Sequence, residues 1–235
     1  MNKLYFLIFI VFMTGCKNQL INYAFERFGI YDDQIKMEKL SLPDKEIVFL
    51  PIHHLGTKKF YENVNLKIDS LKNEKYFFYY EGLSNQRKND TILIKFRKIS
   101  RIPLPEKGYK FFFDSTYANV KFKKPIIDQP TYEKLGLYSS NSINGDATIE
   151  DVVEYYENKF GKLQLNQCDY NTSPFEKYST CKEKNKVSRK KSDAVILDAR
   201  NEVLFKKITN SSHDKIAVIF GSEHLEGFTN LIKKK

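Results

Sequence analysis

Three of the four histidines in this chain of 235 residues lie just past the ends of two apolar runs, and a glutamate follows a third run in the same way. His53 and His54 follow the first run, Glu81 follows the second, and His224 follows the last. Neutral imidazoles ligate divalent metal ions or act as general bases, and a carboxylate can complete a metal site or move protons. If the runs are strands of one parallel sheet, their carboxyl ends meet at one edge, where open α/β sheets bind ligands. The sequence therefore predicts one polar site built from these side chains.

The same side chains also have structural interpretations. His53 or His54 can cap the helix expected after the first run, and Glu81 can lie in a turn. The fourth histidine, His213, is expected on a surface loop. These alternatives predict scattered side chains with separate partners, whereas ligands of one Zn-like ion must each lie within about 2.0 to 2.2 Å of it.

Three runs of strand length, residues 46–51, 76–80 and 215–220, predict the framework that positions this site. Each run is continuously apolar rather than alternating, which is typical of strands covered on both faces, as in parallel sheets. Between the first two runs, residues 58–71 carry apolar side chains mostly at helical spacing, and Thr57 can cap that helix. The pattern predicts a βαβ unit with a right-handed crossover. We therefore expect a single α/β domain with a mainly parallel central sheet flanked by helices.

Two further helices are predicted in the second half of the chain. One opens at Asp146 and runs to the residue before Gly161, because its apolar residues fall on one stripe. The other is capped by Ser192 or Asp193 and runs to about Ile208. A last short helix is expected after the final strand.

The middle of the chain has less regular patterns. Residues 91–96, 109–113 and 120–122 are interpreted as short strands or as loop packing, because several prolines interrupt this part of the sequence. The basic segment of residues 182–191 is expected to be a solvated loop. No Walker loop, GxSxG or HExxH motif is present in the sequence.

The N-terminus has the features of a secretory leader. Lys3 is followed by an apolar stretch, residues 4–13, that is too short to cross a bilayer, since a spanning helix needs about 20 apolar residues. Residues 13–16, Met-Thr-Gly-Cys, resemble the lipobox at which a diacylglyceryl group is added to the cysteine. We therefore expect residues 1–15 to be a lipoprotein signal peptide and Cys16 to carry lipid. An ordinary signal peptide or a membrane anchor with an incidental cysteine is the alternative.

Lipidation at Cys16 would fix the location of the protein. We expect residues 16–44 to be a tether and N-terminal segment, and residues 45–235 to be the domain that it holds at a membrane of the cell envelope, on the periplasmic or outer-membrane side. Cys168 and Cys181 are then an even pair outside the reducing cytosol, so a disulfide between them is expected. Such a bridge would stabilise the fold by roughly 3 kcal/mol in the chain-entropy model.

The composition bounds the function classes. A hydrophobic fraction of 41% with 14% aromatic residues is sufficient for a packed core. The net charge is +10, but only 6 of the 39 basic residues are Arg, the residue with the fork geometry that reads phosphates and guanine edges. We therefore expect no nucleic-acid partner. Weak attraction of the Lys-rich surface to anionic lipid or glycan is the functional alternative to a merely solvated surface.

Taken together, these residues resemble the TraB/TIKI-like (GumN-type) superfamily, whose distant relatives include erythromycin esterases and the haem-associated ChaN proteins. Residues 47–56 resemble its opening strand and GxxH-type motif, and Glu81 matches its glutamate after the second strand. Arg200 with Asn201 resembles its arginine–asparagine helix motif, and residues 221–227, Gly-Ser-Glu-His-Leu-Glu-Gly, resemble its second GxxH motif. Gln129 also fits the pattern. The resemblance implies a TIKI- or erythromycin-esterase-like fold.

Two positions depart from the family pattern. Pro51 stands where the first motif usually has glycine, and Ala199 stands where an acidic residue is common before the arginine. Both departures bear on catalytic competence more than on the fold. The similarity spans roughly residues 46–232.

The resemblance implies a metal-dependent hydrolase or protease that acts on a peptide or ester bond, and the lipid expected on Cys16 would anchor it. In that interpretation His54 and His224 ligate a divalent metal ion of unknown identity, and Glu81 ligates it or moves protons. Arg200 holds the substrate carbonyl or its developing oxyanion, so that Glu81 and Arg200 are the catalytic residues.

His53 and Asn201 are expected to contact the substrate, a peptide or a small molecule. Two other classes of function remain open. One is a non-catalytic module that binds haem, a metal or a small ligand in the same crevice. The other is a structural or interaction lipoprotein that has kept the fold and lost the chemistry.

Overall fold

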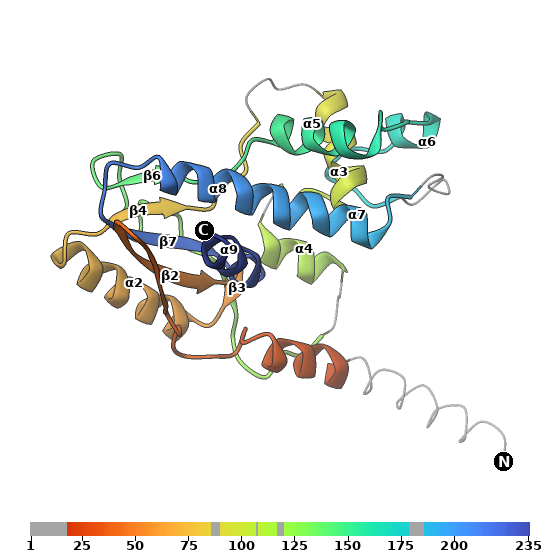
Figure 1. The fold of residues 1–235 in the computed structure, drawn as a ribbon. Coiled ribbons are helices and arrows are strands. Elements are labelled where there is room, and N and C mark those ends of the chain that lie inside the picture. The colour runs from red at the N-terminus through yellow and green to blue at the C-terminus, as the bar shows by residue number, and fades with distance from the viewer. Residues whose placement is uncertain (1–17, 86–89, 107, 117–119, 179–185) are drawn as a thin grey trace, which may run out of the picture.

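The computed structural model describes residues 18–85, 90–106, 108–116, 120–178 and 186–235. Its centre is a five-stranded sheet with the strand order β1-β2-β7-β4-β6 (Figure 1). The strands are β1 (Glu38–Leu42), β2 (Lys45–Ile52), β7 (Lys215–Gly221), β4 (Phe77–Tyr80) and β6 (Ser142–Asn144). From β2 to β6 all neighbours are parallel, and only the edge strand β1 is antiparallel. The prediction of an α/β fold with a mainly parallel sheet is confirmed.

The three predicted strands are adjacent in the sheet, with β7 between β2 and β4. In the register of the sheet Ala217 pairs with Val48 on one side and with Phe78 on the other. Val48, Phe78 and Val218 are all buried. The continuous apolar runs therefore have the physical cause that the sequence suggested, which is burial of both faces of each strand.

Helices cover the two faces of the sheet. On one face α2 (Lys58–Asn73) packs its buried side onto Val48, Leu50 and Phe78. On the other face α8 (Arg200–Thr209) and α9 (His224–Lys233) pack onto side chains of the opposite parity, such as Phe49 and Val218. Figure 1 shows α8 and α2 on either side of the strands.

Capping residues set the ends of the predicted helices. Thr57 accepts a hydrogen bond from the backbone N–H of Phe60 and so starts α2, as predicted. The helix α5 (Ile149–Phe160) ends before Gly161, as expected, but its N-cap is Thr148 in a capping box with Asp151. Asp146, predicted to open that helix, lies before the cap.

The middle of the chain forms helices where short strands were predicted. Residues 91–96 belong to α3 (Asp90–Ser100), and residues 109–113 belong to α4 (Tyr109–Thr116). Residues 120–122 form neither helix nor strand. The strand interpretation was wrong because a short apolar run does not distinguish a strand from a buried helix segment. Ile94 and Ile99 of α3 are buried, the latter in a cluster with α5.

The helix that leads into α8 starts earlier than predicted. It begins with α7 (Arg189–Asp193), capped by Ser188, so the prediction of a cap at Ser192 or Asp193 was wrong. Residues 189–191 are therefore helical and not loop, whereas residues 182–185 lie outside the described residues. Between α7 and α8 the chain forms a π-helix, η1 (Ala194–Ala199).

The segment predicted as a tether contains secondary structure in its described part. Residues 18–27 form a helix, whose Phe25 packs in a cluster with Tyr109 and Phe113 of α4. Residues 38–42 form the strand β1. Two short strands, β3 (Leu55–Gly56) and β5 (Ile127–Asp128), pair with each other beside the main sheet. Among the described residues, no helix has the length and apolarity needed to cross a membrane.

A four-residue helix, α6 (Gln167–Tyr170), is held to α3 by a buried ion pair. Lys98 Nζ lies 2.7 Å from Asp169 Oδ2, and both side chains are inaccessible to solvent. Arg97 adds hydrogen bonds to backbone carbonyls of Thr172 and Ser173. The segment after α6 is thereby fixed against α3, and Pro174 in it accepts a hydrogen bond from the backbone N–H of Leu104.

The interior strand β4, between β7 and β6, is expected to be important for the stability of the domain. Phe78→Ala should lower the free energy of unfolding by about 3 to 5 kcal/mol, because it removes a fully buried ring between the sheet and α2. Urea denaturation monitored by circular dichroism measures this change. Leu66→Ala on the exposed side of α2 is the control and should change it by about 0.5 kcal/mol or less. Equal effects of the two substitutions would contradict the described core.

Candidate functional site

The site predicted from the strand ends lies at the carboxyl edge of the sheet. A cavity of about 300 Å³ opens there, and His54, Glu81 and Arg200 line it. His54 follows β2 and Glu81 follows β4, whereas Arg200 is the first residue of α8. His224 begins α9 just after β7 and lies next to this group outside the cavity lining, with its Nε2 3.7 Å from Glu81 Oε1. The structure thus brings together the four side chains that the sequence singled out.

Arg200 is the centre of the group because it binds two carboxylates. Its Nε donates to Asp146 Oδ1 at 2.8 Å and its Nη2 to Asp146 Oδ2 at 2.6 Å. The same Nη2 donates to Glu81 Oε1 at 2.6 Å. All three side chains are almost completely buried. Both carboxylates raise the pKa of Arg200 against the effect of its burial, so the guanidinium stays charged.

Arg200 directly follows the π-helix η1 in the chain. The π-helix ends at Ala199, and Arg200 Nη1 donates to the backbone carbonyl of Ile196 at 3.3 Å. Single π-turns inside α-helices occur frequently at functional sites. Here the wider turn lies beside the cavity, which Ile196 also lines.

Asp146 is a fully engaged anion. Besides the guanidinium it accepts backbone N–H groups of Gly82 at 3.1 Å and Ala147 at 2.7 Å. It follows the short strand β6 and thereby joins the ends of β4 and β6 to α8. The sequence had predicted Asp146 only as a helix opening, because β6 has three residues and no recognisable strand pattern.

Glu81 has a strongly perturbed pKa. Burial alone would raise the pKa of its carboxyl, but the positive charge of Arg200 and the hydrogen bond from its guanidinium outweigh burial and lower the pKa to about 2. Its second oxygen, Oε2, accepts the backbone N–H of Gly221 at 2.6 Å. A Cβ at position 221 would lie 3.1 Å from that oxygen, so glycine at the end of β7 leaves room for the carboxylate. Glu81 is therefore an ionised group with both oxygens in use.

His224 is held neutral inside the protein. Its Nδ1 lies 2.9 Å from Asn201 Oδ1, and because a carbonyl oxygen only accepts, Nδ1 carries the proton. Burial, together with the positive charge of Arg200, lowers the pKa of His224 to about 4. The predicted contact residue Asn201 therefore orients His224 and is itself 1% exposed.

His54 is the histidine that faces the cavity. Its ring stacks on Tyr109 with a centroid distance of 4.3 Å and an interplanar angle of 2°. Its Nδ1 lies 3.3 Å from Gln129 Oε1. The amide oxygen of Gln129 faces His54 and can only accept, so Nδ1 is the donor of this pair and Nε2 is the ring nitrogen that remains. The structure gives this Nε2 no hydrogen-bond partner among the residues that it describes.

His53 points elsewhere. Its Nδ1 lies 3.4 Å from Ser222 Oγ, its ring packs on Phe60, and Gly29 lies close to its Nε2. Burial lowers its pKa, which favours the neutral ring. The structure does not bring His53 to the described lining of the cavity beside His54.

Metal ligation was predicted for His54, His224 and Glu81. Among the described residues, no group of three or more His, Cys, Asp or Glu side chains lies close enough together to hold a metal ion. The donor set explains this: Glu81 uses one oxygen for Arg200 and the other for a backbone N–H, and His224 faces Glu81 from 3.7 Å. The residues as arranged do not fit a preformed ion site, so no chemical step is derived through a metal here.

Tyr109 was not predicted as a site residue. It opens α4, in a stretch that the sequence left as strand or loop, and its ring forms one wall of the cavity. Burial and the charge of Glu81 raise the pKa of Tyr109 to about 12, so its phenol stays protonated at neutral pH. The stacking of Tyr109 on His54 depends on how α4 packs against the sheet, which the sequence pattern does not indicate.

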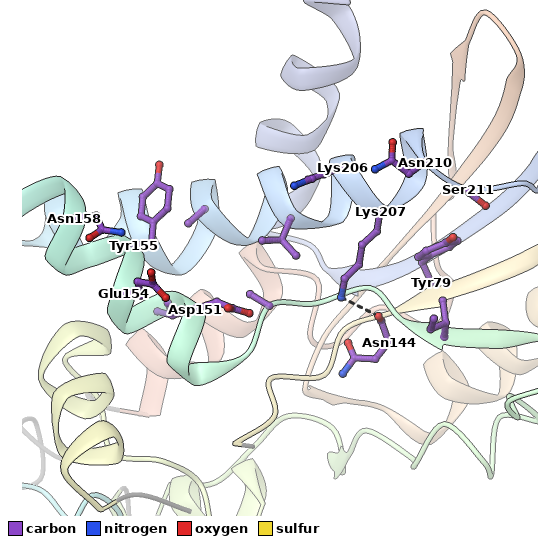
Figure 2. Close-up of a pocket in the computed structure, with 15 residues that line it drawn as sticks. Tyr79, Asn144, Asp151, Glu154, Tyr155, Asn158, Lys206, Lys207, Asn210 and Ser211 are labelled. Carbon is purple, nitrogen blue, oxygen red and sulfur yellow. Dashed lines mark hydrogen bonds between the residues drawn. The ribbon is translucent and has the colours of Figure 1, made fainter. Parts of the chain in front are cut away.

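A larger groove of about 750 Å³ lies between α5, α8 and the edge of the sheet (Figure 2). Lys207 points into its floor and donates to the backbone carbonyl of Asn144 at 3.1 Å and to that of Asp146 at 2.6 Å. Asp151, on its wall, is already used in the cap of α5. Since no histidine is among the described residues that line this groove, we take the smaller cavity as the candidate site.

Comparison with known proteins gives no relatives: no family model, no curated protein and no solved structure matches this chain. The resemblance to the TraB/TIKI-like superfamily therefore stays a prediction from its motifs. Cys16, the signal peptide and Cys181 lie outside the described residues. Lipidation, and a disulfide between Cys181 and Cys168 of α6, likewise stay predictions.

Arg200 is expected to be the most sensitive position of the site for stability. Arg200→Leu should lower the free energy of unfolding by about 3 to 5 kcal/mol, because it leaves two buried carboxylates without their cation. Urea denaturation measures the change, and Arg189→Leu at an exposed position is the matched control. An Arg200→Leu protein as stable as the control would contradict the buried ion network.

Acid is expected to destabilise the protein in two steps, the first caused by protonation of His224 and the second by protonation of Glu81. His224 has a folded pKa of about 4, below its ordinary 6.5, so the unfolded chain binds the proton first and stability is lost as the pH falls from about 6.5 towards 4. Glu81, with a folded pKa of about 2, contributes stability above its ordinary value that is lost below pH 4.5. His224→Asn should remove up to about 3 kcal/mol of the first loss.

Unfolding free energies measured between pH 7 and pH 4 test this assignment. His213→Asn is the control, since His213 is exposed and stacks only on Phe77. If both variants show the pH slope of the unmodified protein, His224 is not the titrating group.

Proposed function

We propose that this protein is a hydrolase of an ester or peptide bond in which His54 is the general base, held at the envelope membrane by its expected lipid anchor. The observation that carries the proposal is the geometry of His54: it is bonded through Nδ1 to Gln129, stacked on Tyr109 and lines the cavity. A base oriented through its other ring nitrogen is the arrangement that general-base catalysis requires.

In the proposed reaction His54 Nε2 takes a proton from a water molecule as the water oxygen attacks the substrate carbonyl carbon. The carbonyl oxygen becomes an oxyanion, to which the protonated phenol of Tyr109 donates a hydrogen bond. The tetrahedral intermediate then collapses, the bond to the leaving oxygen or nitrogen breaks, and His54 returns the proton to that atom. Atoms and protons balance without a further reactant.

Glu81 and Arg200 act in this proposal as positioning residues. Glu81 is ionised and accepts two hydrogen bonds, and the guanidinium of Arg200 is bound to Glu81 and Asp146. Neither is free to exchange protons near neutral pH. Their negative and positive charges hold the ends of β4, β6 and α8 in the geometry that places the cavity beside His54.

His54→Ala should lower turnover of p-nitrophenyl esters by about 10² to 10⁴ while leaving the unfolding free energy nearly unchanged, because His54 is only partly buried. Tyr109→Phe should lower kcat by a smaller factor of about 10². His213→Ala is the control histidine and should retain full turnover. Equal turnover by the His54→Ala and His213→Ala proteins would refute the proposal.

A non-catalytic binding function is the second candidate. It is favoured by one observation, the full engagement of Glu81 and Arg200, which leaves His54 and Tyr109 as the polar groups with free capacity. In that case every ester in the assay would be stable, and a ligand of the cavity would still bind the His54→Ala protein.

A further inference from the structure

The cavity beside His54 has one polar end and otherwise apolar walls. Its polar end is formed by His54, Glu81 and Arg200. The apolar part is built by α3, α5, η1 and the loop between α3 and α4. Leu83, Phe96, Ile102, Leu104, Ile149 and Ile196 supply its surface.

The polar end offers little binding energy to a ligand. Glu81 and Arg200 are buried and satisfy each other together with Asp146 and Gly221, so a charged substrate group would have to break existing ion pairs. A cost of that kind exceeds what a new pair returns in a buried site. Recognition must therefore come mainly from the apolar walls.

The rim of the cavity has an uncovered apolar side chain. Ile102 lines the cavity and is 52% exposed. Its loop is rigid, because Pro103 and Pro105 restrict it and the backbone N–H of Leu104 is bonded to Pro174 in the segment held by the buried Lys98–Asp169 pair. A preformed apolar surface at the mouth of a cavity loses exposure to water when an apolar group enters.

We propose that the substrate carries an acyl group with an alkyl chain, which occupies the apolar part of this cavity while its carbonyl carbon lies at His54. The substrate class is thus an acyl ester with a chain of several methylenes. This inference rests on the proposed hydrolase function. It adds that affinity rises with chain length, by about fourfold for each methylene buried.

Methyl ketones test binding without turnover, because they place a carbonyl beside an alkyl chain but have no leaving group. Isothermal titration of the full chain with 2-butanone and 2-octanone should give about a hundredfold or greater preference for the longer ketone, which has four more methylenes. Equal affinity for the two ketones would overturn the inference.

Ile102→Asp tests the location of the chain. The position is exposed, so the fold should tolerate the change, but a carboxylate at the rim should weaken 2-octanone binding by about tenfold or more. Leu66→Asp, on the exposed side of α2, is the matched control and should bind as the unmodified protein does. Unchanged binding by the Ile102→Asp protein would place the alkyl chain elsewhere and contradict the proposal.

The two proposals can fail separately. If 2-octanone binds preferentially but p-nitrophenyl acetate, butyrate and octanoate are all stable, the inferred acyl site stands and the hydrolase function fails. If esters are hydrolysed through His54 with the same kcat/KM for acetate and octanoate, the hydrolase function stands and the acyl site is refuted.

Discussion

The guanidinium of Arg200 between two buried carboxylates is the constraint on which the described structure depends. Glu81 follows β4, Asp146 follows β6, and Arg200 starts α8, so one cation fixes three elements that are distant in sequence. Each carboxylate also takes backbone N–H groups, from Gly221 for Glu81 and from Gly82 and Ala147 for Asp146. Buried charges are tolerated only with such complete pairing. The carboxyl edge of the sheet is therefore set by electrostatics, while the rest of the sheet is set by apolar packing.

The two histidines near this ion network, His224 and His54, have different surroundings. His224 is enclosed between Asn201 and Glu81 and is kept neutral by burial and by the cation of Arg200. His54 lies outside the ion network, on the side where α4 and the loop before it form the cavity wall. The fixed ion network of Glu81, Arg200 and Asp146 next to a partly accessible imidazole suits catalysis, because preorganised groups need no rearrangement as charge develops.

The sequence predicted those parts of the fold whose signal is contained in one uninterrupted segment. Residues 46–51, 76–80 and 215–220 were recognisable as strands because both faces are buried and, apart from Glu46 and Lys215 at the strand starts, their positions are apolar. The strands β1 and β6 were not recognisable: β1 carries exposed charged residues, and β6 has three residues. The helix α3 was misread because its apolar residues 92–94 are consecutive, and consecutive apolar residues have no helical period.

The site residues were likewise predictable only where a single segment of sequence carried the signal. His54, Glu81 and His224 could be located because each follows a strong strand, whereas Asp146 follows the strand that could not be seen. Tyr109 reaches His54 only through the packing of α4, which no local pattern encodes. The engagement of both Glu81 oxygens depends on the register between β4 and β7, and this explains why ligation by Glu81 looked available from sequence and is not preformed in the structure.

The sheet has two open edges, and each is protected against pairing with another copy of the chain. At one edge β1 turns antiparallel and presents Glu38, Lys39 and Ser41 to solvent. At the other edge β6 is too short to template a long partner, and the Lys207 ammonium occupies the backbone carbonyl of Asn144. Charged residues, short strands and blocked carbonyls are the means by which proteins discourage edge-to-edge aggregation. For a chain expected to be concentrated on a membrane surface, where neighbours meet often, this protection would keep crowded molecules separate.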